Sequence, residues 1–216
     1  MAMSLDVELL DRWTQLAGPG ARAVGEDLVR RYGEPHRRYH TVGHLAAMLA
    51  VIDDLAADAT DLDAVRYAAF FHDAIYAVDG TDNEEASARL VESVLPGLGV
   101  PPETVAEAAR LVRLTGGHHP APDDRNGAVL CDADLAVLAA DESAYAAYTS
   151  AVRAEYAHVP DDLFRSGRAA VLRGLIQQDP LFRTPTGQAR YAAAARANLA
   201  AELAELTAPN APRPGS

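Results

Sequence analysis

Residues 62–78 read LDAVRYAAFFHDAIYAV, and residues 67–71 in the middle of this stretch present apolar side chains almost all round a helix. A helix without a polar face belongs in the core of a protein, because no side of it is suited to water. Asp61, directly before the stretch, is a plausible N-cap for its first turn. The sequence therefore predicts a buried helix over residues 62–78.

Helical periodicity continues on both sides of this stretch, and no segment alternates convincingly with period two. Glycine and proline interrupt the apolar stripes, most densely at residues 116–127, which we interpret as a loop. We expect an all-α, single-domain bundle of about ten helices, over residues 5–17, 21–32, 39–57, 62–78, 82–95, 101–116, 132–140, 142–157, 161–178 and 186–206. Residues 1–206 would form this domain. The tail, residues 207–216, holds three Pro and one Gly and is expected to be disordered.

The composition restricts the class of partner. The 216 residues are 49% hydrophobic, enough for a sizeable core, and carry a net charge of −12, which repels the backbones of nucleic acids. The single cysteine, Cys131, allows no intramolecular disulfide, as is usual in a reducing compartment. The first residues do not resemble a signal peptide, and the apolar stretch 45–52 is too short to span a bilayer. We expect a cytoplasmic protein that binds neither nucleic acid nor membranes.

The pair His72-Asp73 is the feature most indicative of chemistry, because it lies inside the most apolar predicted helix. Burying a carboxylate is costly unless it is paired or coordinates a metal. Imidazole and carboxylate together suit a divalent ion such as Mn, Fe, Co, Ni or Zn, and also tolerate Mg. The alternative is a structural ion pair, or a solvated aspartate at a helix end.

Three other sites hold potential ligands. His40 and His44 lie four residues apart, a spacing that places two side chains on one face of the predicted helix 39–57. Asp132 and Asp134 begin the predicted helix 132–140, where capping of the helix is an alternative role for both. His118 follows two glycines in the predicted loop, where most histidines are simply solvated.

Taken in order, His40, His72-Asp73 and Asp134 resemble the H…HD…D pattern of the HD superfamily of metal-dependent phosphohydrolases. A closer likeness is to an uncharacterised bacterial subgroup of that superfamily, and it covers about residues 38–203. The matching motifs are Tyr39-His40-x-x-x-His44, Phe71-His72-Asp73 with Tyr76, Asp82-Asn83-Glu84 with Ser87, Thr115-x-x-His118, Asp132-Ala133-Asp134-Leu135, Tyr145-x-x-Tyr148, Arg153-x-Glu155-Tyr156, Arg168, and Ala195-Arg196-x-Asn198-Leu199.

The resemblance implies an HD-type helical bundle that holds a divalent transition metal and hydrolyses a small phosphate ester or nucleotide with a metal-activated water. The implied metal ligands are His40, His72, Asp73 and Asp134. His44 competes with His40 for the first position, and Asp132 competes with Asp134 for the last. Asp73 and Glu84 would be the catalytic carboxylates.

The resemblance also suggests supporting residues and rival functions. His44, His118 and Asp132 would form a second metal site or support the first, and Arg38, Arg153 and Arg168 would bind the phosphate of the substrate. The same pattern of ligands is compatible with a di-iron oxygenase, and with a non-catalytic domain that binds nucleotides for regulation.

Overall fold

The computed structural model describes residues 4–208, and this part of the chain is helical without a β-strand. The expected all-α, multi-helix fold is therefore confirmed. The helices are α1 (Leu5–Ala17), α2 (Arg22–Tyr32), α3 (Val42–Asp54), α4 (Leu62–Phe71), α5 (Asn83–Val94), α6 (Pro102–Leu114), α7 (Arg125–Leu135), α8 (Glu142–Glu155), α9 (Asp161–Gln177) and α10 (Pro185–Thr207). Within residues 4–208, no helix has both the length and the apolar character needed to cross a bilayer.

The helix α4 is the centre of the larger of two hydrophobic cores, as its sequence predicts. It packs against α1, α3, α5, α6 and α7. Trp13 of α1 meets Tyr67 and Phe70 of α4 edge-to-face, with ring centroids 5.8 and 5.2 Å apart. A Cβ on Gly25 of α2 would lie 2.3 Å from the Trp13 ring, so only glycine allows the approach of α2 to this ring. Asp61 caps α4 as expected, accepting a 3.0 Å hydrogen bond from the backbone N–H of Ala64.

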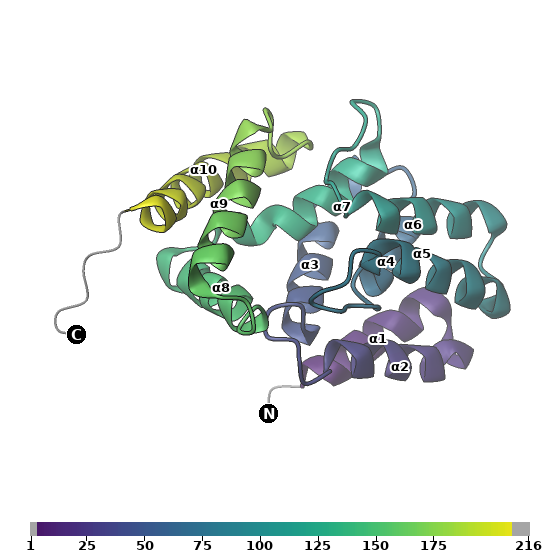
Figure 1. Cartoon of the computed structure of the whole chain (residues 1–216). Coiled ribbons are helices and arrows are strands. Elements are labelled where there is room, and N and C mark those ends of the chain that lie inside the picture. The colour runs from purple at the N-terminus through teal and green to yellow at the C-terminus, as the bar shows by residue number, and fades with distance from the viewer. Residues whose placement is uncertain (1–3, 209–216) are drawn as a thin grey trace.

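The helix α7 connects the two cores. Val129 and Leu130 belong to the larger core, whereas Leu135 at the end of the helix packs with Phe182 and Leu199 in the smaller one. Figure 1 shows α7 running from the side of α6 towards the group formed by α8, α9 and α10. The last turn of α7 therefore lies where the two halves of the fold meet.

The prediction that the central helix continues to residue 78 is wrong, because α4 ends at Phe71. The guanidinium of Arg37, which is only 3% exposed, donates a 2.7 Å hydrogen bond to the backbone carbonyl of Asp73. Arginine side chains commonly satisfy the last carbonyls of a helix in this way. His72 and Asp73 consequently lie just beyond α4, in a turn.

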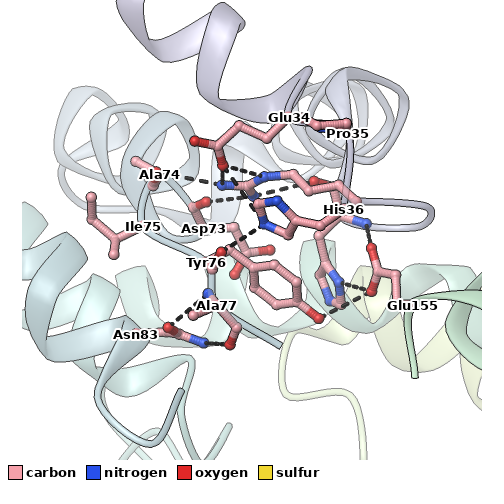
Figure 2. Close-up of polar contacts among 12 residues, drawn as sticks. Glu34, Pro35, His36, Asp73, Ala74, Ile75, Tyr76, Ala77, Asn83 and Glu155 are labelled. Carbon is pink, nitrogen blue, oxygen red and sulfur yellow. Dashed lines mark hydrogen bonds and ion pairs between the residues drawn. The ribbon is translucent and has the colours of Figure 1, made fainter. Parts of the chain in front are cut away.

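Side chains from α5 complete the replacement of helical hydrogen bonds after His72. The backbone N–H of Ile75 donates to the Ser87 hydroxyl at 3.0 Å. The amide of Asn83 both accepts from the N–H of Ala77 (3.0 Å) and donates to its carbonyl (2.9 Å), as Figure 2 shows. These tertiary contacts outweigh the helical pattern of residues 72–78, so this segment is not helical.

The start of α3 also differs from the prediction, because the helix begins at Val42 and not at residue 39. One carboxylate oxygen of Glu155, at the end of α8, accepts hydrogen bonds of 2.7–3.0 Å from the backbone N–H groups of Arg38 and the next two residues. These bonds hold the segment in a non-helical turn. His40 therefore precedes α3 and does not share a helix face with His44.

The predicted helix 132–140 is displaced, because α7 already begins at Arg125 and its N-cap is Asp124, which accepts a 2.8 Å bond from the Gly127 N–H. Part of the predicted loop is thus helical. Asp132 and Asp134 lie in the last turn of α7, so neither caps its start.

The remaining boundaries agree closely with the prediction. Asp82 is the N-cap residue of α5, although its side chain makes no capping bond. The helix α10 includes Thr207, which the sequence assigned to a disordered tail. The rest of that predicted tail, residues 209–216, lies outside the described residues.

The completely buried carboxylate of Asp132 connects α7 to the start of α10. Oδ1 accepts a 2.6 Å bond from the N–H of Arg183, and Oδ2 accepts bonds of 2.8 and 2.7 Å from the N–H and hydroxyl of Thr184. A Cβ on Gly187 would lie 2.2 Å from Asp132 Oδ2, so glycine is required there. These contacts attach the C-terminal helices to the junction of the two cores.

We predict that Asp132→Ala lowers the free energy of unfolding by about 2–4 kcal/mol, because it leaves buried donors on Arg183 and Thr184 without an acceptor. Urea denaturation of the two proteins measures the change. Asp11→Ala, which removes an exposed carboxylate from α1, is the control and should be nearly neutral. A loss no larger than that of the control would contradict the structural role of Asp132.

Candidate metal centre

Three side chains from three helical elements converge at this junction. His44 lies in the first turn of α3, His72 immediately follows α4, and Asp134 lies in the last turn of α7. One ligand atom from each lies within 4.8 Å of the others. His44 Nε2 is 3.2 Å from His72 Nε2 and 3.1 Å from Asp134 Oδ1. The described residues thus contain a cluster of the size that holds a metal ion.

Hydrogen bonds on the far side of the His72 ring determine which of its nitrogens faces the cluster as an acceptor. His72 Nδ1 is 2.8 Å from the backbone carbonyl of Ala69, which can only accept, so Nδ1 carries the proton in the neutral ring. His72 Nε2 then presents a lone pair to the cluster. This arrangement, with a carbonyl behind the imidazole, is typical of metal-binding histidines.

The cluster concentrates negative charge around His72. Burial alone would lower the pKa of His72, but the charges of Asp73 and Asp134 raise that pKa to about 9. Burial likewise opposes ionisation of Asp134, yet its hydrogen bonds with His118 and His44 hold the pKa of Asp134 well below its ordinary value. Acceptor atoms facing one another at these distances need a proton or a cation between them. The two imidazoles and the carboxylate of the cluster therefore fit a divalent ion.

Asp73 borders the cluster, with its Oδ2 3.0 Å from His72 Nε2. Beside it lies a cavity of about 250 Å³. The cavity brings together most of the residues that the sequence indicates as ligands or catalytic groups, and those that line it are His40, His72, Asp73, Glu84, His118 and Asp134. His44 belongs to the cluster but not to the lining of this cavity.

His118 is held against the cluster by an unusual backbone conformation. Its φ is +53°, a left-handed conformation that non-glycine residues rarely adopt. Its Nε2 lies 2.7 Å from Asp134 Oδ2, so the carboxylate has an imidazole at each oxygen. Such strain persists only where surrounding contacts enforce it, and it is common at functional sites.

His40 occupies a different position from His44. Its Nδ1 lies 2.7 Å from Oε2 of Glu155, whose side chain is fully buried, and the Tyr76 hydroxyl donates to the same oxygen at 3.0 Å. Figure 2 shows Tyr76 directed towards Glu155. These contacts orient His40 at the edge of the cavity. Of the two histidines that compete for the first ligand position, the geometry favours His44.

The sequence gives Glu155 and Arg37 no role, although both shape the site. Glutamate near a helix end and arginine beside other polar residues are normally exposed, so neither pattern signals burial. Glu155 contacts His40 across 115 residues of chain. In the sequence, Glu155 is singled out only as part of the Arg153-x-Glu155-Tyr156 motif.

Four of the residues that the sequence proposed are brought neither to the cluster nor to the cavity. Both oxygens of Asp132 are bound to the Arg183–Thr184 backbone, on another side of α7. The three arginines proposed to bind the phosphate of the substrate have other partners among the described residues. The guanidinium of Arg38 bonds to the Pro35 carbonyl, that of Arg153 to the Tyr156 carbonyl, and that of Arg168 to Glu202.

The buried Glu155 predicts a pH dependence of stability. Burial opposes its ionisation, but hydrogen bonding and charge from His40, with bonds from backbone N–H groups, lower the pKa of Glu155 from 4.5 to about 2. A carboxyl whose pKa is lower in the folded state stabilises the protein above its unfolded pKa and ceases to do so as the pH falls towards the folded value.

We therefore expect the free energy of unfolding to decrease between about pH 5 and pH 2, with up to about 3 kcal/mol due to Glu155. Glu155→Gln should be less stable at neutral pH and should lose less stability on acidification. Glu26→Gln, at an exposed position of α2, is the control. Parallel pH profiles for wild type and Glu155→Gln would refute this account.

We compared the chain with models of protein families, with curated proteins and with solved structures, and none of them matches. The likeness to the HD superfamily thus rests on the sequence motifs.

Proposed function

We propose that this chain is a metal-dependent phosphohydrolase of the HD superfamily type, acting on a small phosphate ester or nucleotide. The observation that carries the proposal is the convergence of His44, His72 and Asp134, with Asp73 3.0 Å from His72, beside a small polar cavity. The residues are those that the resemblance designates, except that His44 takes the position for which His40 was preferred.

We assign the metal ligands as His44, His72 and Asp134, with Asp73 adjoining them. Two imidazoles with carboxylates suit Mn, Fe, Co, Ni or Zn better than an all-oxygen site would. When bound, such an ion polarises a phosphoryl oxygen and lowers the pKa of a coordinated water. Behind the two ligand histidines lie the Ala69 carbonyl, which contacts His72 Nδ1, and the Tyr39 hydroxyl, which is 3.1 Å from His44 Nδ1.

The cavity beside these ligands has about the size of a phosphate group and a few waters, at about 250 Å³. Its lining holds the carboxylates of Asp73, Glu84 and Asp134, and its basic side chains are histidines rather than arginine or lysine. A phosphate dianion would be repelled by these carboxylates. Binding of phosphate should therefore depend on the cation and on hydrogen bonds from histidines such as His118.

Glu84 is the carboxylate that we nominate as general base. It projects from the first turn of α5 into the cavity lining, and a Cβ at Gly116 would be 3.5 Å from its Cγ. Glu84 thus packs close to Gly116, in the segment that leads to His118. In this position Glu84 would accept the proton of the attacking water.

We predict that the purified protein binds a divalent transition metal and that His44→Ala and Asp134→Ala abolish this binding. His40→Ala should retain the metal, because Glu155 holds His40 away from the three-residue cluster. Elemental analysis and calorimetric titration with Mn²⁺ measure the binding, and circular dichroism checks that each variant folds. Full metal occupancy in His44→Ala or Asp134→Ala would contradict the ligand assignment.

The matched pair His118 and His119 tests the catalytic part of the proposal. His118 lines the cavity, whereas its neighbour His119 is exposed. We expect His118→Ala to lower kcat/KM for phosphate release by about tenfold or more, as loss of a group that supports a metal site often does, and His119→Ala to leave it unchanged.

The assay measures inorganic phosphate released from para-nitrophenyl phosphate and nucleoside monophosphates with Mn, Mg, Co or Ni. Substrate-dependent O₂ uptake by the iron-loaded protein, without phosphate release, would instead favour the oxygenase. Tight nucleotide binding without turnover would favour the regulatory domain.

A further inference from the structure

A second cavity adjoins the polar one. It lies between α8, α9 and the segment before α3, and its volume is about 460 Å³, within the range of small-molecule binding sites. His40 and Tyr156 line both cavities, so the two spaces border the same two side chains. Figure 1 shows α8 and α9 next to one another, on the same side of α3. A ligand in the second cavity would reach the first past His40.

The lining of the second cavity is mainly apolar. Val152 and Phe164 form part of it, and two side chains of α9 that also line it are exposed to an unusual degree, Leu163 at 61% and Val171 at 55%. These two positions lie eight residues apart, on one face of the helix, with Gly167 midway between them. A Cβ built on the exposed Gly167 meets no atom within 4 Å, so a larger side chain has open space at this edge of the cavity.

Arg168 is the one arginine in this lining, and a carboxylate of the protein itself compensates its charge. Its guanidinium donates bonds of 2.8 and 3.1 Å to the carboxylate of Glu202 and one of 3.0 Å to the Tyr148 hydroxyl. Both ionic side chains are about nine-tenths buried. Arg168 therefore offers little attraction for a second phosphate group, and the cavity favours an uncharged occupant.

We propose that this second cavity binds the leaving group of the substrate, and that the leaving group is an uncharged aryl or alkyl moiety. The inference rests on the proposed function, since it places the phosphoryl group in the polar cavity. The ester oxygen then lies near His40 and Tyr156. Water adds to phosphorus, the P–O bond to the leaving group breaks, and that oxygen takes up the proton released by water. The products are an alcohol or phenol and inorganic phosphate.

Two non-hydrolysable phosphonates test the proposal by direct binding. Methylphosphonate needs only the polar cavity, whereas 2-naphthylmethylphosphonate needs both. Isothermal titration calorimetry with the Mn²⁺-loaded wild type should show the naphthyl compound binding more tightly by roughly tenfold or more, the scale on which apolar pockets discriminate. Equal affinities would overturn the proposal, and so would tighter binding of adenosine 5′-monophosphate, whose leaving group is polar.

The two glycines of α9 that have open space at Cβ supply a matched pair of variants. Gly167→Phe adds a large side chain to the lining of the second cavity. Gly174→Phe adds the same side chain seven residues further along the helix, outside this lining. We expect Gly167→Phe to remove the preference for the naphthyl compound and to leave methylphosphonate binding unchanged. Gly174→Phe should behave as wild type. An unchanged preference in Gly167→Phe would refute the assignment.

The two proposals fail in different ways. If the protein releases no phosphate from any ester but binds the naphthyl compound in a manner that depends on Gly167, the proposed function fails and the apolar site stands. If the protein hydrolyses phosphate esters while Gly167→Phe and Gly174→Phe bind and turn over aryl substrates alike, the apolar site fails and the phosphohydrolase stands.

Discussion

Asp134 has an imidazole at each of its oxygens, and its side chain is only 15% exposed. A carboxylate this far from water requires partners, because the protein interior does not solvate its charge. His44 and His118 supply them from α3 and from the loop before α7. The three elements must therefore meet at one place, and the last turn of α7 is where they do so.

The same requirement explains how the two cores are joined. Glu155, from the C-terminal half, accepts hydrogen bonds from the backbone N–H groups before α3 and contacts the ring of His40. Asp132 accepts hydrogen bonds from the backbone N–H groups before α10. Removing either carboxylate would leave buried donors without acceptors. The candidate site thus depends on both halves of the fold, although the ligand cluster itself comes from α3, the turn after α4, and α7.

The two cavities that border His40 differ in character. One is small and lined by ionisable groups, and the other is larger and mainly apolar. Such an arrangement suits a substrate with a charged end and an uncharged end, because each end finds the surroundings that desolvate it at least cost. The physical contrast between the cavities is the basis for relating the candidate metal centre to the proposed class of substrate.

Apolar periodicity predicted the all-helical fold and most helix positions, since a helix must turn one face to the core wherever it packs. The order of His72-Asp73 and Asp134 indicated a metal centre for the reason that buried carboxylates need a partner. Periodicity could not show that α4 stops at Phe71 or that α7 begins at Arg125. The end of α4 is set by Arg37 and Ser87, which are distant in sequence, whereas the start of α7 is capped by the neighbouring Asp124. The choice of His44 over His40, the separate role of Asp132, and the burial of Glu155 were likewise decided by tertiary structure. Each depends on which distant donor or acceptor a polar group meets, and residue spacing along one chain does not contain that information.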